Sequence, residues 1–71
     1  MGKRKREKLI RNVLRQRLEM LGKTQNWLSQ ETGISLHHIN ALINGRWNPQ
    51  LSSAMKIAKT LIAKVDDLWF Y

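Results

Sequence analysis

One segment in the middle of the chain, TQNWLSQETGISLHHINALING from position 24 to 45, constrains the fold more than any other feature. It places the small Ser29 four residues before Gly33, and the β-branched Ile39 six residues after that glycine. Two short helices that cross at a steep angle need a small side chain where their axes approach. They also need a residue that tolerates positive φ at the corner, and apolar groups on their inner faces. The spacing therefore predicts two helices joined at Gly33, with the outer face of the second free to enter a DNA major groove.

Helical patterns flank this segment on both sides. Before it, apolar residues recur with helical spacing, and Gly22 supplies the left-handed residue that often ends a helix. After it, Pro49 predicts a loop over 46–50 that leads into a fourth helix. Asp66 and Asp67 are suited to the N-terminus of a short fifth helix. The apolar repeats before and after the segment are Ile10, Val13, Leu14, Leu18 and Leu21, and Leu51, Ala54, Met55, Ala58, Leu61 and Ile62.

Capping residues set the limits of the two central helices. Thr24 and Ser35 are good N-caps, while Gly33 and Gly45 are suited to the ends. No stretch alternates convincingly between apolar and polar residues, as a strand would. We therefore expect an all-α fold, a compact five-helix domain over residues 9–71 that follows a flexible basic arm over residues 1–8.

The charge distribution favours a polyanionic partner. Of 71 residues, 13 are Lys or Arg and 5 are Asp or Glu, which gives a formal net charge of +8. Such a field attracts nucleic acid or an anionic membrane surface. Nine of the basic residues lie in the first 23 positions, whereas 24–45 contains none, so this segment does not act through cations. Cysteine is absent, so neither disulfides nor thiolate metal sites are available.

The central segment resembles the helix-turn-helix of the phage-repressor and Cro type. The resemblance covers about residues 9–69 and implies a lambda-repressor-like DNA-binding domain. The chain departs from the family pattern at Trp27, Thr32 and Leu36, and at Ile62-Ala63, where a glycine commonly ends the fourth helix. The matching positions are Thr24-Gln25, Leu28, Ser29, Gly33-Ile34-Ser35, Ile39, Leu42, Asn44-Gly45 and Asn48-Pro49.

The resemblance implies a role for each matching polar position. Gln25 would contact a phosphate, and the start of the third helix would face base edges. The residues after that helix would contact the DNA backbone. Independently of the resemblance, the charge of the basic arm predicts that it lies along the backbone or enters a minor groove. The complete set of predicted DNA contacts is Gln25, Asn26, Ser35, Leu36, His37, Asn40, Ala41, Asn44, Arg46, Asn48, Lys3, Arg4, Lys5 and Arg6.

The predicted reading face is chemically neutral. Leu36 and Ala41 can pack on thymine methyl groups, and Asn40 and His37 can hydrogen-bond to base edges. Because the segment has no arginine to bind guanine, we expect half-sites that contain A·T pairs. Most of the affinity must then come from the basic arm, from Arg46 and from helix dipoles directed at phosphates.

Other kinds of site find little support. His37 and His38 are adjacent and point apart on a helix, without a third metal ligand. The five carboxylates are scattered and form no pair with a nucleophile, so we expect no enzymatic activity, no metal and no cofactor. His38 is expected to be simply exposed. Trp27 and Trp47 either contact DNA or a partner, or pack on neighbouring helices, and packing is favoured.

The last four residues, Leu68-Trp69-Phe70-Tyr71, concentrate apolar area near the end of the chain. Part of this tail should close the core. The rest is suited to a two-fold dimer contact that would hold two reading helices about one DNA turn apart.

The function best supported at this point is a sequence-specific transcription regulator. We expect a soluble, cytoplasmic, nucleoid-associated homodimer, a short Cro-like repressor of a phage or mobile element, without a small-molecule effector. Regulation would work through concentration and competition for operators. The alternatives are an antitoxin-like autoregulator, a mobile-element control protein such as an excisionase, and a protein-interaction module whose helix-turn-helix no longer binds DNA. A basic membrane-surface helix over residues 3–21 is disfavoured, because the bundle needs its apolar face.

Overall fold

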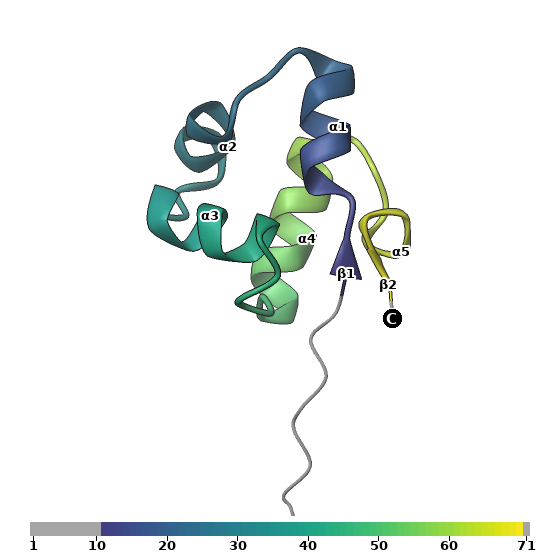
Figure 1. Cartoon of the computed structure of the whole chain (residues 1–71). Coiled ribbons are helices and arrows are strands. Elements are labelled where there is room, and N and C mark those ends of the chain that lie inside the picture. The colour runs from purple at the N-terminus through teal and green to yellow at the C-terminus, as the bar shows by residue number, and fades with distance from the viewer. Residues whose placement is uncertain (1–10, 71) are drawn as a thin grey trace, which may run out of the picture.

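The computed structural model describes residues 11–70 and contains five helices and two very short strands (Figure 1). The all-α, five-helix prediction is confirmed by this arrangement. The elements in chain order are β1 (Arg11–Asn12), α1 (Leu14–Leu21), α2 (Gln25–Thr32), α3 (Leu36–Ile43), α4 (Leu51–Thr60), α5 (Val65–Leu68) and β2 (Trp69–Phe70).

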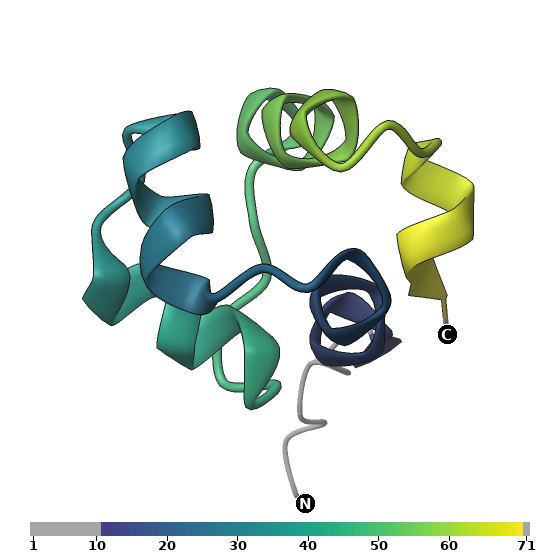
Figure 2. The ribbon, with the colours of Figure 1, turned by 90° about the horizontal axis from the view of Figure 1, so that it is seen from above.

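The helices are arranged around a central pair. In both Figure 1 and Figure 2, α2 and α3 lie together on one side of α1 and α4, and α5 with β2 lies on the other side. The crossed pair α2–α3 is thus exposed along its outer side, while α1 and α4 support it from within.

A single apolar core joins all five helices, and α4 contributes more of its residues than any other helix. The buried face of α4 follows helical spacing at Ala54, Ile57, Ala58 and Leu61. The remaining buried apolar residues in the described chain are Leu14, Leu18, Leu28, Ile39, Leu42, Leu68 and Trp69.

Several apolar residues of the predicted repeats lie outside this core. Leu51, Met55 and Ile62 are 70%, 57% and 88% exposed, and Leu21 is 43% exposed. Ile57, which the predicted repeat omits, is buried. The helical period of α4 was recognised correctly, but its buried face was assigned too widely.

The start of α1 differs from the prediction. Val13 precedes the helix as its N-cap, and Arg11–Asn12 pairs with Trp69–Phe70 in an antiparallel ladder. The backbone N–H of Val13 donates to Leu68 O at 3.0 Å, so these residues are tied to the C-terminal segment. Val13 thus stands at the N-cap and packs against the core as one of its partly buried residues, while neither ladder strand was predicted. Ile10 lies outside the described residues.

Ile62 ends α4 with an unusual backbone conformation. Its φ is +55°, in the left-handed region, and no other non-glycine residue among 11–70 has a positive φ. Its N–H donates to Lys59 O at 3.1 Å, and the N–H of Ala63 donates to Ala58 O at 2.9 Å. This is the Schellman pattern of helix ends, with a β-branched residue where glycine is usual.

The tail and the two central tryptophans pack as expected. Leu68 and Trp69 are buried, while Phe70 is 43% exposed. Trp27 and Trp47 are half-buried against the core, which confirms the packing interpretation. Within residues 11–70, no helix is long and apolar enough to cross a membrane.

Candidate nucleic-acid interface

The turn between α2 and α3 is held by hydrogen bonds from side chains of α2. Gly33 adopts φ +77°, as predicted for the corner of the motif. Ser29 Oγ donates to the carbonyl of Ile34 at 2.6 Å, so this small residue fastens the turn as well as leaving space. Thr32 Oγ1 donates to Leu28 O at 2.8 Å and accepts from the N–H of Ile34 at 3.2 Å. These bonds explain a hydroxyl at position 32, although the residue is buried.

The third helix divides into a buried and an exposed side. Ile39 and Leu42 are buried in the core, and they fix the rotation of α3 about its axis. Leu36, which is 41% exposed, lies with His37 and Asn40 on the solvent side, and Ala41 is half-buried beside them. The structure therefore gathers the predicted base-reading side chains on one outward face, here called the reading face (residues 36, 37, 40 and 41).

Ser35 begins α3 and also engages His38. Its Oγ accepts from the backbone N–H of His38 at 3.2 Å and lies 2.9 Å from His38 Nδ1. The His38 ring stacks on Trp47, with 4.9 Å between ring centroids and planes inclined by 34°. His38 is exposed as expected, but it links the start of α3 to the following loop, which the sequence did not indicate.

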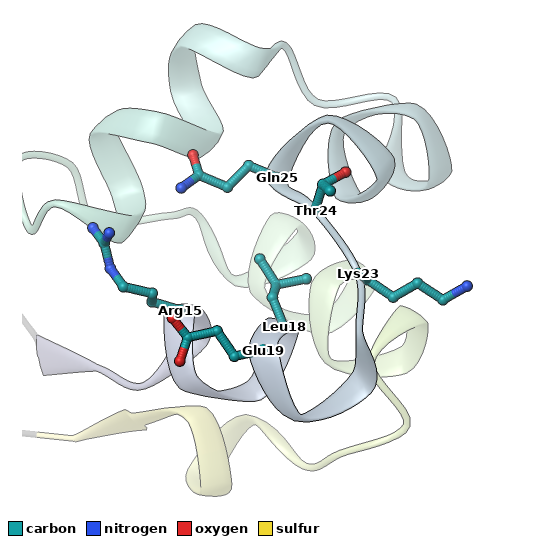
Figure 3. A pocket seen from close by; sticks show the side chains of 6 residues that line it. All are labelled: Arg15, Leu18, Glu19, Lys23, Thr24 and Gln25. Carbon is teal, nitrogen blue, oxygen red and sulfur yellow. The ribbon is translucent and has the colours of Figure 1, made fainter.

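The start of α2 borders a small hollow. Thr24 caps the helix by accepting from the N–H of Trp27 at 3.0 Å. Gln25 is half-buried and Asn26 is exposed. Figure 3 shows Gln25 and Arg15 extending toward α3, while Lys23 points away from them. The hollow has a volume of about 200 Å³, and its lining residues are Arg15, Leu18, Glu19, Lys23, Thr24 and Gln25.

Residues that follow α3 continue the candidate surface. Asn44 and Arg46 are exposed, and Asn48 is half-buried. The helix ends with two backbone hydrogen bonds. The N–H of Gly45 donates to Leu42 O at 3.0 Å, and the N–H of Arg46 donates to Ala41 O at 2.8 Å. Asn44 Oδ1 accepts from Arg15 Nη2 at 3.1 Å, a contact between residues 29 positions apart. No local spacing in the sequence indicates this contact, and Arg15 was absent from the predicted site.

The charge of the described residues remains positive without the basic arm. Residues 11–70 include eight Lys or Arg and four Asp or Glu. In this range no group of three or more His, Cys, Asp or Glu residues is placed to hold a metal ion. The predicted contacts Lys3, Arg4, Lys5 and Arg6 lie outside the described residues.

The family model for helix-turn-helix domains of the Cro/C1 type matches residues 14–68, which span the five helices and most of the core. The chain belongs to this helix-turn-helix family. The match includes the turn at Gly33 and the fourth and fifth helices, so the predicted resemblance is confirmed.

Relatives of this helix-turn-helix chain include two archaeal proteins and one bacterial structure. An uncharacterised HTH-type transcriptional regulator of Methanocaldococcus jannaschii is 32% identical over 62 residues, covering 87% of this chain and 94% of the relative. A protein of the same description from Archaeoglobus fulgidus is also 32% identical over 62 residues, covering 87% and 89%. The crystal structure of a proposed DNA-binding protein from Bacteroides fragilis superposes with a TM-score of 0.77 at 23% identity, covering 86% and 98%, and supports the fold.

Proposed function

We propose that this helix-turn-helix chain is a sequence-specific regulator of transcription that places α3 in the major groove of double-stranded DNA. The observation that carries the proposal is the division of α3, whose inner side is locked in the core by Ile39 and Leu42 while its outer side presents Leu36, His37 and Asn40. A rigidly mounted helix with exposed groups of small and medium size is what major-groove readout requires. The two archaeal relatives described as HTH-type regulators support the same function.

The reading face distinguishes bases through apolar contact and neutral hydrogen bonds. The exposed side chain of Leu36 and the methyl group of Ala41 are suited to thymine methyls, and the amide of Asn40 is suited to adenine. His37 adds a ring nitrogen that can hydrogen-bond to a base or a phosphate. We therefore propose half-sites that contain A·T pairs.

Backbone contacts supply most of the affinity in this proposal. The residues proposed for these contacts are Gln25 and Asn26 at the start of α2, and Asn44, Arg46 and Asn48 after α3. The basic arm adds further phosphate contacts. Such contacts position the protein without reading sequence, and they make binding sensitive to salt.

The narrower form of the proposal is a short Cro-like repressor that binds as a homodimer. Phe70, which is 43% exposed beside the buried Trp69, is the residue that we propose for the two-fold contact. A palindromic site should then bind two copies, with half-sites about one helical turn (~34 Å) apart. Sedimentation of a Phe70→Ser variant on such a site should show one copy, and two copies at unchanged affinity would exclude this residue. Origin in a phage or mobile element stays a prediction.

Selection of bound DNA from a random library, repeated at two salt concentrations, tests the main proposal. An enriched motif supports it, and the absence of a motif at both concentrations refutes it. The motif also allows a sharper test, in which the contacted thymine is replaced by deoxyuridine. Loss of one methyl contact should weaken binding of the native chain by about 1 kcal/mol, as for one buried methyl group.

Leu36→Ala should remove this discrimination between thymine and uracil. Leu21→Ala is the matched control, since Leu21 is similarly exposed (43% against 41%) but ends α1. The control should retain the discrimination. If Leu36→Ala also retains it at every thymine of the motif, then Leu36 does not read thymine, and the proposed reading face is wrong.

A further inference from the structure

Arg15 is a cation of the first helix whose side chain reaches the end of α3. It belongs to α1, outside the helix-turn-helix segment, and its Nη2 donates to Asn44 Oδ1 at 3.1 Å. Both side chains are exposed. A cation from the first helix is therefore held beside the reading face, although the segment 24–45 has no basic residue of its own.

Gln25 approaches the same place from α2. It lines the hollow together with Arg15, and Figure 3 shows the polar ends of both side chains directed toward α3. Three neighbouring elements thus contribute one hydrogen-bonding group each: the guanidinium of Arg15, the amide of Gln25 and the amide of Asn44.

The chemistry of these groups suits a phosphate. A guanidinium carries five N–H donors, of which the contact with Asn44 uses one, and its planar fork matches two phosphate oxygens. Glu19 lines the hollow one turn further along α1, but it makes no ion pair with Arg15 in the described chain. The hydrogen-bond partner that positions the guanidinium is therefore a neutral amide, not a carboxylate.

We propose that Arg15, Asn44 and Gln25 form one binding site for a phosphodiester of the DNA backbone, adjacent to the reading face. Asn44 positions Arg15 in this site, which lowers the ordering cost of the contact. The site deepens the proposed function and rests on it. The site also gives α1 a direct contact with DNA, although α1 lies outside the helix-turn-helix segment 24–45.

The test compares Arg15→Gln with Arg17→Gln on the same duplexes. Arg17 lies two residues further along α1, which places it on nearly the opposite side of the helix, and its replacement removes the same charge. Arg15→Gln should weaken binding about ten-fold and reduce the slope of log affinity against log salt by about 1, as expected for one lost phosphate contact. Arg17→Gln should change affinity by less than about three-fold, because it removes only a distant charge. Circular dichroism should show the native helical content for both variants.

A scan with methylphosphonates, which neutralise one phosphate at a time, locates the site. At one position, the methylphosphonate should lower the DNA affinity of the native chain about ten-fold. It should leave the affinity of Arg15→Gln unchanged, because that variant already lacks the guanidinium that contacts this phosphate. Asn44→Ala should show an intermediate response at that position. If Arg15→Gln and Arg17→Gln have equal affinities and equal salt slopes, or if no methylphosphonate position distinguishes Arg15→Gln, the proposed site is refuted.

The design separates this site from the proposed function. Phosphate contacts do not depend on sequence, so the two variants are also compared on a duplex of arbitrary sequence. Failure of the native chain to select any motif would refute the proposed function, while a selective loss in Arg15→Gln on the arbitrary duplex would still support the phosphate site. A selected motif with equal variants would support the function and refute the site.

Discussion

Replacing Ile62 by glycine should stabilise the protein. Ile62 is the residue with φ +55° that ends α4, and its side chain is 88% exposed. A Cβ atom in the left-handed region approaches the following carbonyl oxygen, and a second substituent on Cβ adds to the crowding. Glycine has no Cβ and adopts this conformation freely, so the strain should disappear while the helix-ending hydrogen bonds stay in place.

The expected gain follows from opposing contributions. The left-handed conformation costs an L-residue roughly 1–2 kcal/mol, and glycine removes this cost. The unfolded chain gains conformational entropy at the new glycine, and this lowers the free energy of unfolding by roughly 0.5–1 kcal/mol. The apolar burial lost with a side chain this exposed is small, under about 0.5 kcal/mol. With mid-range values, the net effect should be a rise of about 0.5 kcal/mol in the free energy of unfolding, or a few degrees in Tm for a domain of this size.

Urea unfolding followed by circular dichroism measures this difference, with Ile62→Ala as the matched control. Alanine removes the same exposed apolar atoms and the branch at Cβ but retains the Cβ itself, so it should remain within about 0.5 kcal/mol of the native chain. The difference between the two variants then isolates the backbone conformation, and equal slopes against urea would confirm that the unfolded states are comparable. If Ile62→Gly is no more stable than Ile62→Ala, the reasoning about strain at this position is wrong.

Three further contacts give predictions of similar precision. Ser29→Ala should lower the free energy of unfolding by about 1 kcal/mol in a urea titration, because the carbonyl of Ile34 loses its donor at 2.6 Å. Asn12→Ala should cost about 1–2 kcal/mol in the same assay, since the Asn12 amide donates to Leu42 O at 2.9 Å and its Oδ1 accepts from the N–H of Leu14 at 3.1 Å. His38→Ala should change the free energy of unfolding by less than about 0.5 kcal/mol, as is usual at exposed positions. The same substitution should weaken DNA binding measured by fluorescence anisotropy, because the loop after α3 loses its stacking contact between Trp47 and His38. An unchanged DNA affinity would show that this stack does not position the loop.

The parts of the fold that the sequence predicted are those governed by local chemistry. Gly33 and the caps Thr24 and Ser35 act within a few residues of themselves, and all three adopt the expected roles. The period of α4 was also visible, but its orientation was not, because Leu51 and Met55 satisfy the same helical spacing as the buried residues. Which side of an apolar helix faces the core depends on the neighbouring helices, and single-sequence patterns do not contain that information.

The contacts that the sequence did not predict connect distant parts of the chain. Asn12 reaches the last turn of α3 from a two-residue strand, which is too short to produce a period of two. The ladder with Trp69–Phe70 exists because the C-terminal segment returns beside the start of α1 (Figure 1). Trp47 stacks on His38 nine positions earlier, since the loop after α3 turns back toward the start of that helix.

Base recognition and phosphate binding involve neighbouring residues in the proposed site, although the sequence places them in separate segments. In the sequence, the cations precede the motif, and reading and binding the backbone look like properties of separate segments. The fold brings Arg15 to Asn44, so one of the early cations lies at the end of α3. A basic arm alone would raise affinity for any duplex without fixing the register of α3. A guanidinium held by Asn44 can do both, because a phosphate contact at a fixed distance from α3 determines which base pairs the reading face meets.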